Sequence, residues 1–150
     1  MNAFKLPAPQ RLEAWGNFRD SLSAMPELDQ IMAVAEFWQH CPFDRWVLDP
    51  LSPNDWMSPW EMLYEGQYCI NCVAVGIEST LRYSGWDESR LELVMIKEDD
   101  ALASEFFVVK IDNKYVLNYS YGQCVPIEEL DASINFLYAY RWNGKSYARI

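Results

Sequence analysis

Apolar and small residues recur at helical spacing over residues 69–81, and this stripe constrains the fold more than any other feature of the sequence. Its members follow one another at steps of three and one, which places them on a single helix face: Cys69, Cys72, Val73, Gly76, Ile77, Thr80 and Leu81. We therefore expect a buried helix over 69–84, ended by Gly85. Gly76 lies within the stripe, where the missing side chain lets another backbone or a bulky ring approach closely.

Downstream of this helix the sequence changes to strand patterns bounded by turn signals. Asp112–Asn113 and Asn143–Gly144 are typical of tight turns between paired strands. Because the connections between successive runs are short, we expect an antiparallel meander. About five strands are predicted, over residues 91–96, 105–112, 114–119, 134–142 and 145–150.

The first part of the chain predicts helices and a packed loop. Two helices are expected within residues 9–41, and a short third helix over 59–65, with Ser58 as its cap and Glu61 as the reciprocal capping partner. The intervening loop carries apolar side chains that should pack down, namely Trp46, Leu48, Leu51 and Trp56. The 150 residues then form a single α+β domain, in which residues 1–58 precede a core of helix and sheet over 59–150.

The charge balance excludes several classes of partner. The chain has 22 acidic and 12 basic residues and a formal net charge of −10, which argues against nucleic acid and anionic membranes as ligands. No apolar run approaches the roughly 18 residues of a membrane span, and residues 1–10 lack the apolar region of a secretion signal. We expect a protein kept in a reducing compartment and not secreted. Aromatic residues make up 15% of the chain, and they serve either its core or a surface that binds another protein.

Four cysteines offer several chemistries. They are not expected to form a disulfide framework in such a compartment. Cys69 and Cys72 have the spacing of redox and metal sites, and zinc would need further ligands from His40, Cys41 or Cys124. Because Cys69 and Cys72 both lie on the buried stripe, the sequence favours a structural role for them, with zinc and redox chemistry as alternatives. No metal ion or cofactor is predicted.

Cys69 is also the candidate nucleophile, since the first turn of a helix favours a thiolate. A cysteine nucleophile normally needs an adjacent base, usually histidine. The chain has one histidine, His40, at a predicted helix end away from the sheet. The acidic Glu105 would raise the pKa of a nearby thiol. We therefore expect Cys69 to be buried and protonated at pH 7.

Residues 59–121 resemble the core of the transglutaminase-like and papain-like cysteine hydrolases, particularly the bacterial transglutaminase-like cysteine proteinases. That family places a cysteine at the start of a helix, a histidine at the start of the second of three antiparallel strands, and Asp or Asn at the end of the third. The matching positions here are Cys69, Glu105 and Asn118. The resemblance implies a transglutaminase-like fold whose site is degenerate, with no catalytic residues expected.

Two further segments, 59–61 and 116–119, resemble uncharacterised proteins of tailed bacteriophages. Three functions follow. The first is a non-catalytic protein that binds another protein, as a structural or assembly component of the virion. The second is an active cysteine hydrolase or acyltransferase that uses Cys69, with His40 brought close to it. The third is an acidic phage inhibitor that occupies a host protein in the host cytoplasm. The sequence predicts no oligomeric state.

Overall fold

The protein has an α+β fold, with its long helices in the first half of the chain and a sheet in the second. A computed structural model describes residues 2–43, 47–99, 102 and 104–150. Within them the helices are α1 (Ala8–Leu22), α2 (Glu27–Gln39), α3 (Pro59–Glu65) and α4 (Ile70–Tyr83), with 3-10 turns at Ala3–Lys5, Pro53–Asp55, Glu88–Arg90 and Ile127–Glu129. The strands are β1 (Leu91–Glu98), β2 (Phe106–Ile111), β3 (Tyr115–Leu117), β4 (Cys124–Pro126), β5 (Ile134–Trp142) and β6 (Tyr147–Arg149). The predicted fold class is confirmed.

The six strands form one antiparallel sheet in the order β4-β3-β2-β1-β5-β6. Strands β1, β2 and β3 follow each other as a meander, as predicted, and β4 continues it. The chain then crosses to the other side of β1, where β5 pairs, so the meander prediction is wrong for the connection into β5. The predicted turn at Asn143–Gly144 does join the paired strands β5 and β6. Strand β4 was not predicted because it has three residues and ends in a proline, which carries no strand signal.

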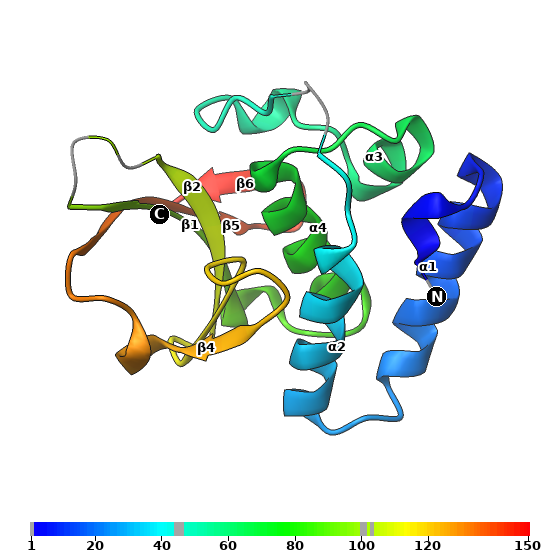
Figure 1. Cartoon of the computed structure of the whole chain (residues 1–150), viewed down its shortest axis with the longest axis horizontal. Helices are drawn as coiled ribbons and strands as arrows, with labels where there is room; N and C mark the ends of the chain where they lie inside the picture. Colours follow the sequence, from blue (N-terminus) through cyan, green and yellow to red (C-terminus); the bar gives the residue numbers. More distant parts are fainter. Residues whose placement is uncertain (1, 44–46, 100–101, 103) are drawn as a thin grey trace.

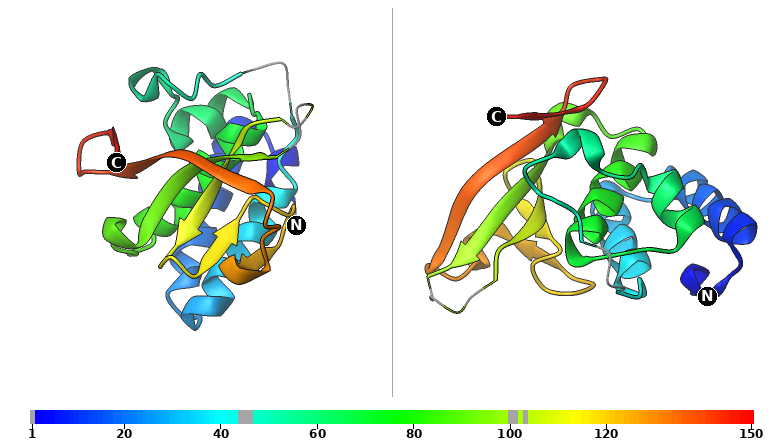
Figure 2. Two further views of the ribbon diagram at one scale, coloured as in Figure 1. Left: turned by 90° about the vertical axis from the view of Figure 1, so that its left-hand side faces the viewer. Right: turned by 90° about the horizontal axis from the view of Figure 1, so that it is seen from above.

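Helix α4 lies between two layers, with the sheet on one side and the other helices on the opposite side (Figures 1 and 2). It packs on β1 and β2 and also contacts α1, α2 and α3. Every residue from Cys72 to Leu81 is consequently buried. The stripe in the sequence predicts the burial of only one face of this helix. The opposite face is buried because elements from elsewhere in the chain cover it. Within the described residues, no helix is both long and apolar enough to cross a membrane.

Two tryptophans fix the outer helices on α4. Trp15 of α1 and Trp38 of α2 are fully buried, and each donates its indole N–H to Thr80 Oγ1 at 3.0 Å. The Trp38 ring lies directly over Gly76: a Cβ atom at Gly76 would be 2.4 Å from the nearest ring carbon. The predicted close approach at Gly76 is therefore confirmed, and the neighbour is a bulky ring.

The expected helix cap and most of the packed loop are also present. Ser58 and Glu61 form the reciprocal capping box at the start of α3, with both hydrogen bonds at 3.2 Å. In the preceding loop, Leu48 is buried, and the Trp56 ring packs edge-on against aromatic rings of β2 and β5. Leu51 is exposed, contrary to expectation, because it sits in a polar turn whose amide bonds to Asp49. Trp46 lies outside the described residues.

Candidate functional site

The two thiols of Cys69 and Cys72 meet at the N-terminus of α4. Cys69 is the N-cap residue: its backbone is extended, and its Sγ accepts a hydrogen bond from the Cys72 amide at 3.3 Å. The position suits a thiolate because the first amides of a helix have no intrahelical acceptor. The Cys72 Sγ atom lies 2.8 Å from Cys69 Sγ and is fully buried, whereas Cys69 is half-buried.

These contacts make the Cys69 thiol more acidic than the Cys72 thiol. The hydrogen bond from Cys72 lowers the pKa of Cys69 to about 6, although burial acts against it, and the amides of Cys72, Leu48 and Asn71 lower that pKa further. The same hydrogen bond, together with burial, raises the pKa of Cys72 well above its ordinary value. Cys69 is therefore less buried than expected, and its contacts lower its pKa, which opposes the expected protonated thiol; its protonation state at pH 7 stays a prediction. Sequence reasoning weighed the helix dipole and Glu105 and missed the thiol donor one turn away.

A third cysteine, Cys41, lies close enough to interact with this pair. It follows α2 and is buried, and both burial and the charge of Cys69 raise its pKa. Tyr121 donates its hydroxyl to the Cys41 carbonyl at 3.4 Å. Cys124 stands on β4, where burial raises its pKa. In the part of the chain that the structure describes, no three His, Cys, Asp or Glu side chains are grouped so that they could hold a metal ion.

Asn118 is brought to the same end of α4 as Cys69. It is buried, has a left-handed backbone with φ 68°, and donates its side-chain amide to the carbonyls of Ile70 (3.1 Å) and Phe107 (2.8 Å). The Phe107 amide in turn donates to Asn71 Oδ1 at 2.9 Å. Asn118 and Asn71 thus join the start of α4 to the start of β2.

The other two candidates do not join this cluster. Glu105 is an exposed residue just before β2. Burial raises the pKa of Tyr138 on β5, and the charges of Tyr140 and Glu105 raise it further. His40 is exposed at the C-terminal cap of α2 and lines a shallow cavity of about 260 Å³ with Phe37 of α2 and Phe18 of α1. The one imidazole of the chain therefore lines a surface cavity of α1 and α2, while the next residue, Cys41, is the one that interacts with the thiol pair.

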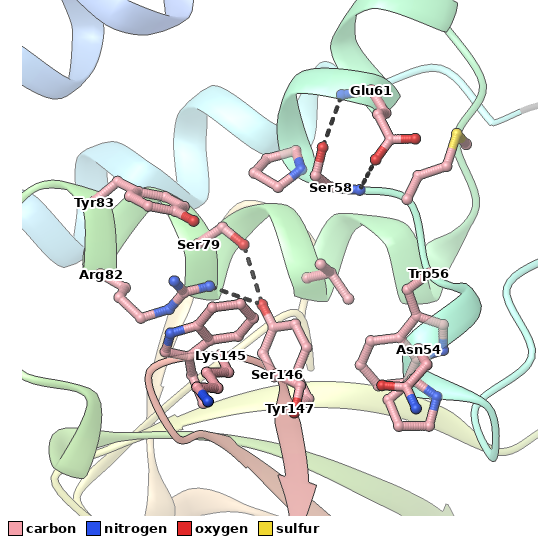
Figure 3. A pocket seen from close by; sticks show the side chains of 15 residues that line it. Asn54, Trp56, Ser58, Glu61, Ser79, Arg82, Tyr83, Lys145, Ser146 and Tyr147 are labelled. Carbon is pink, nitrogen blue, oxygen red and sulfur yellow. Dashed lines mark hydrogen bonds between the residues drawn. The ribbon is translucent and has the colours of Figure 1, made fainter.

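A second site is a groove of about 220 Å³ between α4, the loop before α3 and the β5–β6 hairpin (Figure 3). Its walls are aromatic, from Trp56, Tyr83, Trp142 and Tyr147, and Ser79 and Arg82 project into it from α4. Sequence reasoning missed this groove. Its lining comes from separate segments, each of which carries an ordinary aromatic pattern, so no local signal could have revealed it.

A buried polar network forms one side of the groove. Arg82 bonds to the Glu78 carboxylate through two nitrogens, at 3.0 and 3.2 Å, and its guanidinium lies 4.0 Å over the Trp142 ring. Tyr147 donates its hydroxyl to the same carboxylate at 2.6 Å and accepts from Arg82 at 3.2 Å. Burial raises the pKa of Tyr147 well above its ordinary value. The network therefore links α4 to β6 along this wall of the groove through the Glu78 carboxylate.

Comparisons with known proteins identify the fold. No protein-family model matches the chain, and no curated protein matches it significantly. Among solved structures it is similar to LapG from Legionella pneumophila, with a TM-score of 0.71 and 20% identity over 88% of this chain and 73% of that one. Calcium-bound and EGTA-treated LapG give TM-scores of 0.68 and 0.72, each at 20% identity, over 90% and 92% of this chain and 78% of theirs.

The chain thus has the fold of LapG, which is that of the transglutaminase-like cysteine proteases. This is the fold that the sequence resemblance implied. An identity of 20% identifies the fold and carries no activity from LapG to this chain.

Proposed function

We propose that this protein uses a cysteine-protease fold to bind another protein and that it does not hydrolyse peptide or acyl bonds. The observation that carries the proposal is the set of groups around Cys69. The thiol meets a second thiol and backbone amides, while the one imidazole of the chain, His40, is exposed beyond the end of α2. Hydrolysis of an amide needs an acid to protonate the leaving amine and a base to activate water. A cysteine with a lowered pKa provides neither this acid nor this base.

An activated ester tests the absence of hydrolysis, because it separates acylation of the thiol from hydrolysis of the acylated protein. Nitrophenolate leaves without an acid, so the Cys69 thiolate should be acylated by p-nitrophenyl acetate and release one equivalent of nitrophenolate. Because the contacts of Cys69 within the described residues include no base that could activate water for deacylation, we expect no steady-state turnover above that of the Cys69→Ser variant. Continuous turnover that is lost in Cys69→Ser would contradict the proposal and establish the alternative, an active hydrolase or acyltransferase.

The binding surface in this proposal is the groove together with an aromatic ridge beside it, formed by Trp60, Tyr64 and Tyr83. Trp60 and Tyr83 pack with ring centroids 4.6 Å apart, and both remain 40% exposed, while Tyr64 is 58% exposed. Tyr83 also lines the groove, so ridge and groove are continuous. Exposed Trp and Tyr side chains beside a pocket are the usual anchors of protein interfaces. The groove volume suits one or two apolar side chains of a partner.

Photo-crosslinking tests this surface directly. With benzoylphenylalanine in place of Tyr64, we expect one discrete crosslinked protein in the cells that make the chain. The matched control is Leu28, which is 45% exposed on α2, away from the ridge, and should give no such product. Equal crosslinking at both positions, or none at Tyr64, would contradict the proposed surface.

Our more specific proposal is that the partner is a structural or assembly protein of a phage particle. Its support is the sequence resemblance of residues 59–61 and 116–119 to phage proteins. Mass spectrometry of the product crosslinked at Tyr64 tests it. A virion protein is the expected result, whereas a host protein would favour the acidic inhibitor.

A further inference from the structure

The geometry of Cys69 and Cys72 suits a reaction that differs from hydrolysis. Two thiols lie in contact at one helix end, with their Sγ atoms 2.8 Å apart. They are also unequal: Cys69 is half-buried and caps the helix, and Cys72 is fully buried behind it. The spacing of three residues lets a disulfide close between an N-cap and the first turn, since such side chains are neighbours. We propose that Cys69 and Cys72 form a redox-active dithiol that reduces disulfides.

The chemistry of disulfide exchange explains why this site needs no histidine. Amide hydrolysis expels an amine, which must be protonated, whereas disulfide exchange expels a thiolate, which leaves unaided. The requirements are an accessible thiolate and a second thiol within reach of it. Cys69 meets the first requirement, because the Cys72 thiol and the helix amides lower its pKa. Cys72 meets the second and remains protonated until Cys69 has reacted.

The proposed reaction has two balanced steps. First, the Cys69 thiolate attacks one sulfur of a disulfide R–S–S–R, forms a mixed disulfide Cys69–S–S–R and releases RS⁻. Cys69 is then no longer a thiolate, so the hydrogen bond that it accepted from Cys72 is lost. In the second step, Cys72 transfers its proton to the RS⁻ just released and attacks Cys69 Sγ, which releases the second RS⁻ and closes the Cys69–Cys72 disulfide. The protein loses two electrons and the two R groups gain them. This activity goes beyond the proposed binding function and does not require it.

Equilibration with glutathione tests the proposal. Reduced protein is incubated with mixtures of reduced and oxidised glutathione, remaining thiols are alkylated at acid pH, and the linked peptides are identified by mass spectrometry. We expect the Cys69–Cys72 disulfide to appear in a single two-electron transition that follows [GSH]²/[GSSG]. The Cys72→Ala variant should instead accumulate glutathione on Cys69, because the second step is removed.

The third thiol provides the control. Cys41→Ser should still show a single transition to the Cys69–Cys72 disulfide, because Cys41 lies outside the contacting pair. A disulfide that joins Cys41 to Cys69 or Cys72, or a Cys69–Cys72 disulfide that forms at no glutathione ratio, would overturn the proposal. The wild-type measurement decides the question even if a variant fails to fold. The outcome is independent of the ester and crosslinking experiments, which report on hydrolysis and binding.

Discussion

The Gly76→Ala variant is expected to unfold at a lower denaturant concentration than the wild type, despite a better helix former in the middle of α4. Its Cβ would lie 2.4, 2.5 and 2.7 Å from three carbons of the Trp38 ring, where real contacts exceed 3 Å. The ring cannot withdraw, because its indole N–H bonds to Thr80 and its faces meet Phe4 and Phe37 at centroid distances of 5.4 and 5.8 Å.

Overpacking of a dense core costs about 1–3 kcal/mol and sometimes more, and the helical preference of Ala over Gly returns only about 1 kcal/mol. We therefore expect Gly76→Ala to lower the free energy of unfolding by up to about 2 kcal/mol, and Gly76→Leu to lower it further. Gly16 of α1 is the matched control, since the nearest atom to its Cβ would be Arg19 Nη2 at 3.7 Å. Gly16→Ala should stabilise the protein by up to about 1 kcal/mol. Equal effects of the two substitutions in urea denaturation would contradict this packing.

The sequence predicts the helices and the central strands because their signals are local. The stripe from Cys69 to Leu81 and the capping box at Ser58 are patterns within single elements, and the structure confirms both. The position of β5 beside β1 depends on a pairing of segments about 40 residues apart, which no local pattern encodes. The burial of both faces of α4 likewise comes from tryptophans on α1 and α2.

The candidate site is likewise predicted from the sequence only in part. The resemblance matches Cys69 and Asn118 by their order along helix and strand, and the structure brings both to one end of α4. The expectation of a protonated Cys69 does not take the sulfur of Cys72 into account, because its approach to 2.8 Å depends on side-chain geometry at the helix cap. Sequence spacing identifies the pair without indicating which thiol is acidic.

The second large effect concerns this thiol. In a Cys41→Ser/Cys124→Ser background, alkylation of Cys69 by iodoacetamide should follow an apparent pKa of about 6, well below the ordinary cysteine value of about 8.5. Because Cys72 is the largest cause, Cys72→Ala should move that pKa upward, with the helix amides as its remaining support. The fraction of thiolate at pH 6 should then fall more than tenfold.

The pH dependence of Cys69 alkylation, measured with and without the Cys72 thiol, is the most direct test of whether a neighbouring thiol activates this cysteine in place of a histidine. Site-specific labelling rates between pH 4 and 10 give both midpoints, and a thermal melt of each variant confirms that it is folded. The result we predict is a midpoint near 6 with Cys72 present and a clearly higher midpoint in Cys72→Ala. A midpoint near 8.5 in both proteins, or a low midpoint that Cys72→Ala leaves unchanged, would contradict the account.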